Sequence, residues 1–112
     1  MQLLVVVLND VDKLESLLKE FINIGIKGAT VIDSTGMARV LHDDLDNIPI
    51  FGSIKMFINE NYPYNKTIFV VLNDNQLQPA IKAIKKTLGD LSKPDAGILF
   101  TIPVNYIEGI NI

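Results

Sequence analysis

The same succession of an apolar run, a polar pair and an amphipathic segment occurs twice in this chain. Val7-Leu8-Asn9-Asp10 recurs as Val71-Leu72-Asn73-Asp74. The residues before each Asn-Asp pair are mostly apolar and β-branched, which indicates a buried strand, and the residues after it repeat apolar side chains at helical spacing. Gly28 and Gly97 then each open a further apolar stretch. The chain therefore contains two tandem β-α-β units, a succession that restricts the folds open to it.

Two such units are the signature of a ferredoxin-like βαββαβ fold, an α+β architecture with an antiparallel four-stranded sheet and two helices on one face. The pattern predicts strands over residues 3–8, 28–33, 67–72 and 97–103, and helices over residues 11–22 and 77–88. Asn9-Asp10 offers a cap for the first helix, Gly25 a glycine at its end, and Pro79 must lie in the first turn of the second helix. A chain of 112 residues fits a single domain, 1–112, with a long loop between strands two and three.

The predicted strands do not alternate polar and apolar residues. A strand with one solvated face shows that alternation, whereas residues 3–8, 68–72 and 98–100 are apolar throughout. Two helices cover only one face of a sheet, so the other face needs a cover, and another copy of the chain is the simplest one. If Val6 and Val70 face such a shared interior, a charged side chain at either position should disrupt the assembly.

Composition narrows the class of protein. Cysteine is absent, which rules out disulfides, thiolate zinc sites and cysteine nucleophiles, and mildly favours a cytoplasmic location. The formal net charge is −3 and the basic residues form no cluster, so we do not expect nucleic-acid binding. The apolar start lacks a basic leader and a cleavage site, and no apolar run reaches the roughly 18 residues of a membrane span. We therefore expect a cytoplasmic protein that meets a membrane only through a partner.

Three stretches resemble the nitrogen-regulatory PII family. Residues 24–31, IGIKGATV, resemble the IGVKGLTV stretch that leads into the family's second strand, and residues 97–104, GILFTIPV, resemble GKIFVLPV in its fourth. Gly36-Met37-Ala38-Arg39 resembles GFGR. The resemblance implies a homotrimer with inward-facing sheets and small effectors in clefts between subunits. It also implies that the long loop contacts and regulates a target protein, such as a transporter or a metabolic enzyme.

The same resemblance implies two groups of site residues. The effector-binding group is Gly36, Met37, Arg39, Gly89, Ala96 and Gly97, and the partner-binding loop contains His42, Asp43, Asp44 and Phe51. Arg39, the chain's only arginine, could anchor an anionic effector, or it could be a solvated residue or part of an ion pair between subunits. The turn between Gly89 and Gly97 could present backbone amides to a ligand, or it could be an ordinary helix-to-strand turn. The apolar residues around Phe51 could contact a partner or form a lid on the sheet.

The chain departs from the family at positions that hold phosphates and magnesium. Val40 stands where the family has a glutamine ligand, Ile98 where it has a phosphate-binding lysine, and Glu108-Gly109-Ile110-Asn111 where it has two arginines. A triphosphate needs several cations or backbone donors to replace its lost hydration. We therefore expect a divergent PII-like regulator that binds ATP weakly or not at all and does not bind 2-oxoglutarate with magnesium. Its effector would be a smaller adenine nucleotide or another anion.

Two other functions fit parts of the sequence. His42-Asp43-Asp44 with Asp46 offers imidazole and carboxylate ligands for a divalent metal. A CutA-like, metal-responsive trimer of the same fold would need such ligands. A lone histidine in an acidic loop, however, is more often only solvated. A hydrolase of the acylphosphatase type would need a glycine-rich loop and an arginine after the first strand, where the chain has Asn9-Asp10-Val11-Asp12. No catalytic constellation or cofactor motif is present, so we expect a regulatory binding protein in nitrogen or related metabolism rather than an enzyme.

Overall fold

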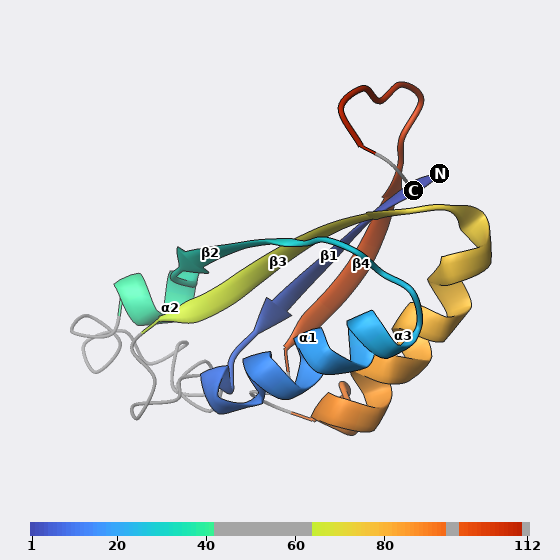
Figure 1. Ribbon diagram of the computed structural model, residues 1–112. Coiled ribbons are helices and arrows are strands. Elements are labelled where there is room, and N and C mark those ends of the chain that lie inside the picture. The colour runs from blue at the N-terminus through green and yellow to red at the C-terminus, as the bar shows by residue number, and fades with distance from the viewer. Residues whose placement is uncertain (42–63, 94–96, 111–112) are drawn as a thin grey trace.

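Four strands form one antiparallel sheet in the computed structural model, which describes residues 1–41, 64–93 and 97–110. The strands are β1 (Gln2–Leu8), β2 (Thr30–Ser34), β3 (Asn65–Leu72) and β4 (Ile98–Pro103). Their order is β2-β3-β1-β4, so each β-α-β unit contributes one central strand and one edge strand (Figure 1). This arrangement is that of a ferredoxin-like fold, and the prediction of that fold is confirmed.

Two helices pack side by side on one face of the sheet. The short 3-10 turn η1 (Val11–Lys13) leads into α1 (Leu14–Asn23), α3 (Asp74–Leu88) follows β3, and Figure 1 shows both helices on the same side. Asp10 accepts a hydrogen bond from the Asp12 N–H at 3.2 Å, which is the cap that the sequence predicts. Gly25, with a φ of +88°, follows α1 as predicted and donates its N–H to the Ile22 carbonyl at 3.0 Å.

The start of α3 differs from the predicted one. The helix begins directly after Asn73 because Asn73 and Gln76 form a capping box. Asn73 Oδ1 accepts from the Gln76 N–H at 3.2 Å, and Gln76 Oε1 accepts from the Asn73 N–H at 3.1 Å. Pro79 therefore lies in the second turn, and the prediction that it lies in the first is wrong. The carbonyl that Pro79 leaves without a helical N–H belongs to Asn75, an exposed residue, so water can satisfy it.

A short element that the sequence did not predict follows β2. β2 begins at Thr30 rather than at residue 28, and a one-turn helix, α2 (Met37–Val40), comes after it. Gly36 precedes this turn, and its carbonyl accepts a hydrogen bond from the Val40 N–H at 3.0 Å. Residues 42–63, most of the long loop between β2 and β3, lie outside the described part of the chain. α2 sets where Gly36 and Arg39 stand relative to the end of β2.

The face of the sheet that carries the helices holds the core. Alternate residues of β1 and β3 and one side of each helix are buried there: Leu4, Val6, Leu8, Leu17, Phe21, Ile68, Val70, Leu72, Ala80, Ala83, Ile84 and Leu88. Val6 and Val70 are fully buried among these residues. The premise that they face an interior shared between copies is therefore wrong, and a charge at either position would disrupt the core of the chain itself.

The opposite face of the sheet is apolar, and the helices leave it uncovered (Figure 1). Three rows of side chains cross β3, β1 and β4 in register: Val71, Leu3 and Ile102; Phe69, Val5 and Phe100; Thr67, Val7 and Ile98. Val5, between Phe69 and Phe100, is only 4% exposed, whereas Phe100 is 45%, Ile102 46% and Ile98 59% exposed. The prediction that these strands are apolar on both faces while the helices cover one of them is confirmed. We call this surface the open face.

Candidate functional site

The predicted effector residues fall into two groups at the same end of the sheet. Gly36, Met37 and Arg39 lie in and just before α2, after β2, while Gly97 directly precedes β4 and Gly89 directly follows α3. β2 and β4 are the two edges of the sheet. With strands about 4.8 Å apart, the end of β2 and the start of β4 are separated by three strand spacings, or about 14 Å. A single chain therefore does not join the two groups in one compact site, and Ala96 lies outside the described residues.

Gly97 and Gly89 have positive φ angles that the fold itself requires. A Cβ on Gly97, at a φ of +116°, would lie 2.5 Å from the carbonyl oxygen of Val7, so β4 can begin against β1 only with a glycine at this position. Gly89, at a φ of +79°, ends α3 and donates its N–H to the Lys85 carbonyl at 2.9 Å. Packing against β1 thus accounts for the glycine at position 97 whether or not an effector binds there.

The turn after α3 carries a negative charge. Asp90 accepts a hydrogen bond from the Ser92 hydroxyl at 2.6 Å and another from the Ser92 N–H at 2.9 Å. These two bonds hold the pKa of the Asp90 carboxyl below its usual value, so the carboxylate is ionised at neutral pH. A carboxylate next to Gly89 repels an anion, which makes this turn a poorer place for a phosphate than the surroundings of Arg39 at the other edge of the sheet.

Polar side chains gather where β2 ends and β3 begins, beside α2. Lys66 Nζ donates to the Asp33 carboxylate across the two strands. The Ser34 and Thr67 hydroxyls share a hydrogen bond of 2.7 Å, and Ser34 Oγ also donates to the Asn65 carbonyl at 3.4 Å. These contacts tie the two strands together at the point where the chain leaves β2 and returns to β3.

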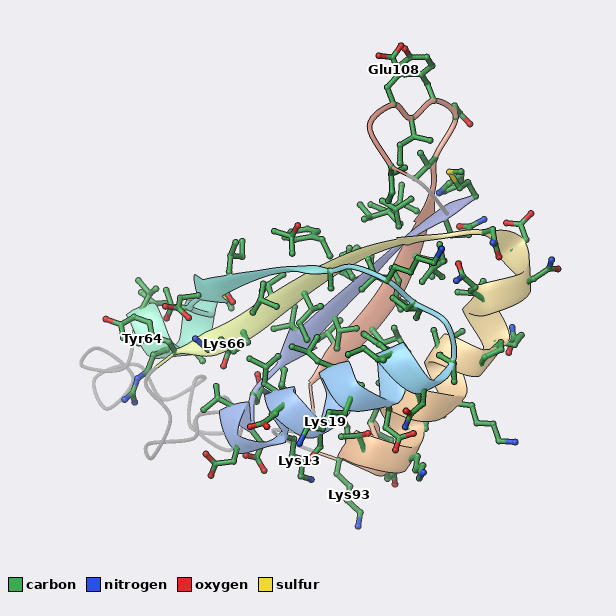
Figure 2. The ribbon with its side chains drawn as sticks, in the orientation of Figure 1. Lys13, Lys19, Tyr64, Lys66, Lys93 and Glu108 are labelled. Atoms are coloured by element: carbon green, nitrogen blue, oxygen red, sulfur yellow. The ribbon has the colours of Figure 1, made fainter. Side chains whose placement is uncertain are left out.

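Arg39 and Asn65, beside α2, have no side-chain partner among the described residues. Arg39 is half-buried and forms neither an ion pair nor a hydrogen bond with the part of the chain that the structure describes, and the Asn65 carboxamide is likewise free there. A Cβ on Gly36 would lie 3.9 Å from Asn65 Nδ2, so Gly36 leaves the amide accessible. Figure 2 shows Lys66 here, beside α2, where Asp33 neutralises it. Among the described residues beside α2, where β2 ends and β3 begins, Arg39 is therefore the cation without a partner, which suits one anionic group.

Sequence reasoning missed five residues of this polar group, namely Asp33, Ser34, Asn65, Lys66 and Thr67. These residues lie outside the Gly36-Met37-Ala38-Arg39 motif, and no sequence pattern joins them to it. Only the register between β2 and β3, in which Ser34 pairs with Asn65 and Asp33 with Lys66, brings these residues together. The one signal in the sequence was Arg39 itself, the only arginine of the chain.

Two hollows lie at the other end of the sheet. The larger, of about 210 Å³, lies between the connection after α1, the end of β3, the first turn of α3 and the segment after β4, with walls that include Gly25, Lys27, Gly28, Val71, Gln76 and Ile110. Gln76 Nε2 donates to the Gly25 carbonyl at 3.2 Å and joins two of these walls. The second, of about 170 Å³, lies between α1 and β2. Each is smaller than the roughly 300 Å³ at which ligand pockets begin, and no predicted effector residue lines either one.

The segment after β4 is acidic where the resemblance implies arginines. Figure 2 shows Glu108 at the tip of this segment, well away from the helices. The Tyr106 hydroxyl donates to the Glu108 carboxylate, which raises the pKa of Tyr106. Glu108 adds negative charge here, and this supports the expectation that the chain holds a triphosphate poorly.

The predicted partner-binding loop, with His42, Asp43, Asp44 and Phe51, lies outside the described residues, as does Asp46. Within residues 1–41, 64–93 and 97–110, no three histidine, aspartate or glutamate side chains are grouped so that they could hold a metal ion. The same residues contain no helix whose length and apolar character would let it cross a membrane.

No protein-family model matches this sequence, and no curated protein matches it. The resemblance of three short motifs to the PII family and the geometry of the described residues are therefore the observations from which a function is proposed.

Proposed function

We propose that this chain is a PII-like signalling protein of the cytoplasm. It assembles as a homotrimer, senses a small effector in clefts between subunits and regulates a protein partner, such as a transporter or an enzyme of nitrogen or related metabolism. The observation that carries the proposal is the open face, an apolar surface that the described residues leave without a cover.

The open face has the composition of a surface buried between copies. Eight of the nine side chains in its three rows are apolar, and the ninth, Thr67, satisfies its hydroxyl with Ser34. From strand geometry these rows span about 300 Å², which reaches the size of the largest apolar patches on ordinary monomers. Because the polar groups of this face are already paired, burying it against other copies would cost little in lost hydrogen bonds.

The positions of the effector residues support a site shared between copies. The Arg39 group and the Gly97 group stand on opposite edges of one sheet, about 14 Å apart. An assembly that covers the open face also brings sheet edges of different copies near one another. A second copy can then complete the surroundings of Arg39, which the described residues of one copy leave without a partner.

Light scattering of the purified chain tests the assembly. We expect a homotrimer for the wild type and a monomer for Phe100→Asp, because a charge in the middle row cannot be buried between copies at low cost. Thr101→Asp is the matched control: it adds the same charge one residue along β4, at an exposed position on the other face, and should keep the trimer. Circular dichroism establishes that both variants fold.

A wild-type monomer at micromolar concentration would refute the assembly. A dimer would leave the open face covered but remove the homotrimer. Equal behaviour of Phe100→Asp and Thr101→Asp would show that the open face is not the surface through which the copies meet.

A further inference from the structure

We infer that Asn65 contacts the effector, and that its carboxamide and the Arg39 guanidinium together hold a single phosphate group of that effector. The inference rests on the proposed function, since it names a residue and a ligand chemistry for the same site. Sequence reasoning assigned no role to Asn65.

The position of Asn65 is the first step. It is the first residue of β3, half-buried, and pairs with Ser34 at the end of β2. Its backbone carbonyl accepts from Ser34, yet its side-chain amide has no partner among the described residues. A half-buried amide with unused donors is expected to find a partner, and Asn65 Nδ2 is the nearest atom to the place of a Gly36 Cβ, at 3.9 Å.

The distance to Arg39 is the second step. Arg39 follows Gly36 by three residues in the one-turn helix α2, so the two positions lie within about 6 Å along the helix surface. Gly36 in turn adjoins the Asn65 amide. The flexible Arg39 side chain can therefore reach the space in front of Gly36, where the Asn65 amide also lies.

Charge selects the ligand. A guanidinium donates two parallel hydrogen bonds to the oxygens of a phosphate, and an amide N–H adds one more. Lys66, the other cation here, is already paired with Asp33. One uncompensated charge fits one phosphate group rather than a chain of three. The Ser34 and Thr67 hydroxyls are engaged with each other, whereas the Asn65 amide has no partner among the described residues and can donate to a ligand.

Calorimetry with AMP and with inorganic phosphate tests the inference on the full chain. Asn65→Asp keeps the shape of the side chain but replaces the amide donor with a carboxylate, which repels the phosphate. We expect it to weaken AMP binding at least tenfold. Asn75→Asp, at an exposed position in the first turn of α3, is the control with the same change of charge and should bind AMP as the wild type does. Asn65→Leu, which removes the donor without adding charge, should weaken binding several-fold.

Each outcome separates this inference from the proposed function. If the wild type binds AMP and Asn65→Asp binds it equally well, the role of Asn65 is wrong and the proposed function stands. If the wild type binds neither AMP nor phosphate, the phosphate site is wrong, and the proposed function is then judged by the mass from light scattering alone. If Asn65→Asp changes the mass measured by light scattering and leaves the AMP affinity of the remaining assembly intact, Asn65 belongs to a contact between copies, which also overturns its role as a ligand residue.

Discussion

At the scale of single residues, Gly97 shows how one position joins the two halves of the chain. Its missing side chain lets β4 begin against the backbone of β1, since a Cβ there would overlap the Val7 carbonyl oxygen. Gly89 has a similar positive φ but faces open space, because a Cβ at this position would meet nothing within 4 Å. The two glycines therefore separate the cost of backbone strain from the cost of overlap.

We expect Gly97→Ala to lower the free energy of unfolding by about 3 kcal/mol or more, because strain at a positive φ adds to overpacking. Gly89→Ala should lower it by only about 1 kcal/mol, since strain acts there alone. Urea denaturation at one protein concentration measures both losses of free energy. The comparison requires that the free energy of unfolding falls with urea concentration at the same slope in wild type and variants. Equal losses in the two variants would mean that the start of β4 moves away from Val7 at little cost.

At the scale of elements, the capping box explains why α3 begins where it does. The reciprocal bonds of Asn73 and Gln76 satisfy two N–H groups at the start of the helix and outweigh the proline six residues further on. The repeated Asn-Asp pair marks where both helical segments start, because Asp10 caps the 3-10 turn η1 that leads into α1, and Asn73 caps α3. Local chemistry of this kind can be recognised without knowing the rest of the fold.

Asn73→Ala should destabilise the protein by about 1 kcal/mol, the usual effect of losing a helix cap. Asn75→Ala, two residues into the same helix and exposed, should change stability by a few tenths of a kcal/mol at most. Thermal unfolding followed by circular dichroism gives the difference. Equal midpoint temperatures of unfolding for Asn73→Ala and Asn75→Ala would show that the cap contributes nothing to stability.

At the scale of the whole molecule, the distribution of charge limits what the proposed effector site can hold. Beside α2, among the described residues, Arg39 has no partner and Lys66 is paired with Asp33, while Asp90 and Glu108 place negative charge at two other positions that the resemblance associates with phosphates. A charge-assisted hydrogen bond contributes roughly 1.5–3 kcal/mol, so missing cations cost several factors of ten in affinity.

Calorimetry with ATP, ADP and AMP should therefore show that ATP binds no more tightly than AMP, and that 2-oxoglutarate with magnesium does not increase the affinity. Val40 offers no polar atom to a magnesium ion, which is the reason for the second expectation. Micromolar binding of magnesium-ATP that 2-oxoglutarate tightens would show that other residues supply the missing contacts. Arg39→Lys, which keeps the charge but loses the paired N–H groups, serves as the reference for loss of phosphate binding.

Most of the element order could be predicted because it depends on neighbours in the chain. Apolar runs, the spacing of apolar residues after Asn9-Asp10 and Asn73-Asp74, and glycines after helices all act over a few residues. The excess of apolar residues in the strands likewise indicated that the sheet has a second face to bury. Apolar runs, helical spacing and glycine positions depend only on nearby residues, so they do not depend on how distant parts of the chain pack.

Packing decided the features that depend on residues far apart. Because β1 and β3 are apolar on both faces, their two-residue period could not tell which face the helices would cover, and it is Val6 rather than Val5 that lies beneath them. The pairing of Ser34 with Asn65 joins residues 31 positions apart, and it alone sets the Asn65 amide beside Gly36. Hydrophobic periodicity is a local property, whereas register is settled by the summed contacts of whole strands, so the polar group around Arg39 emerges only when the sheet is complete.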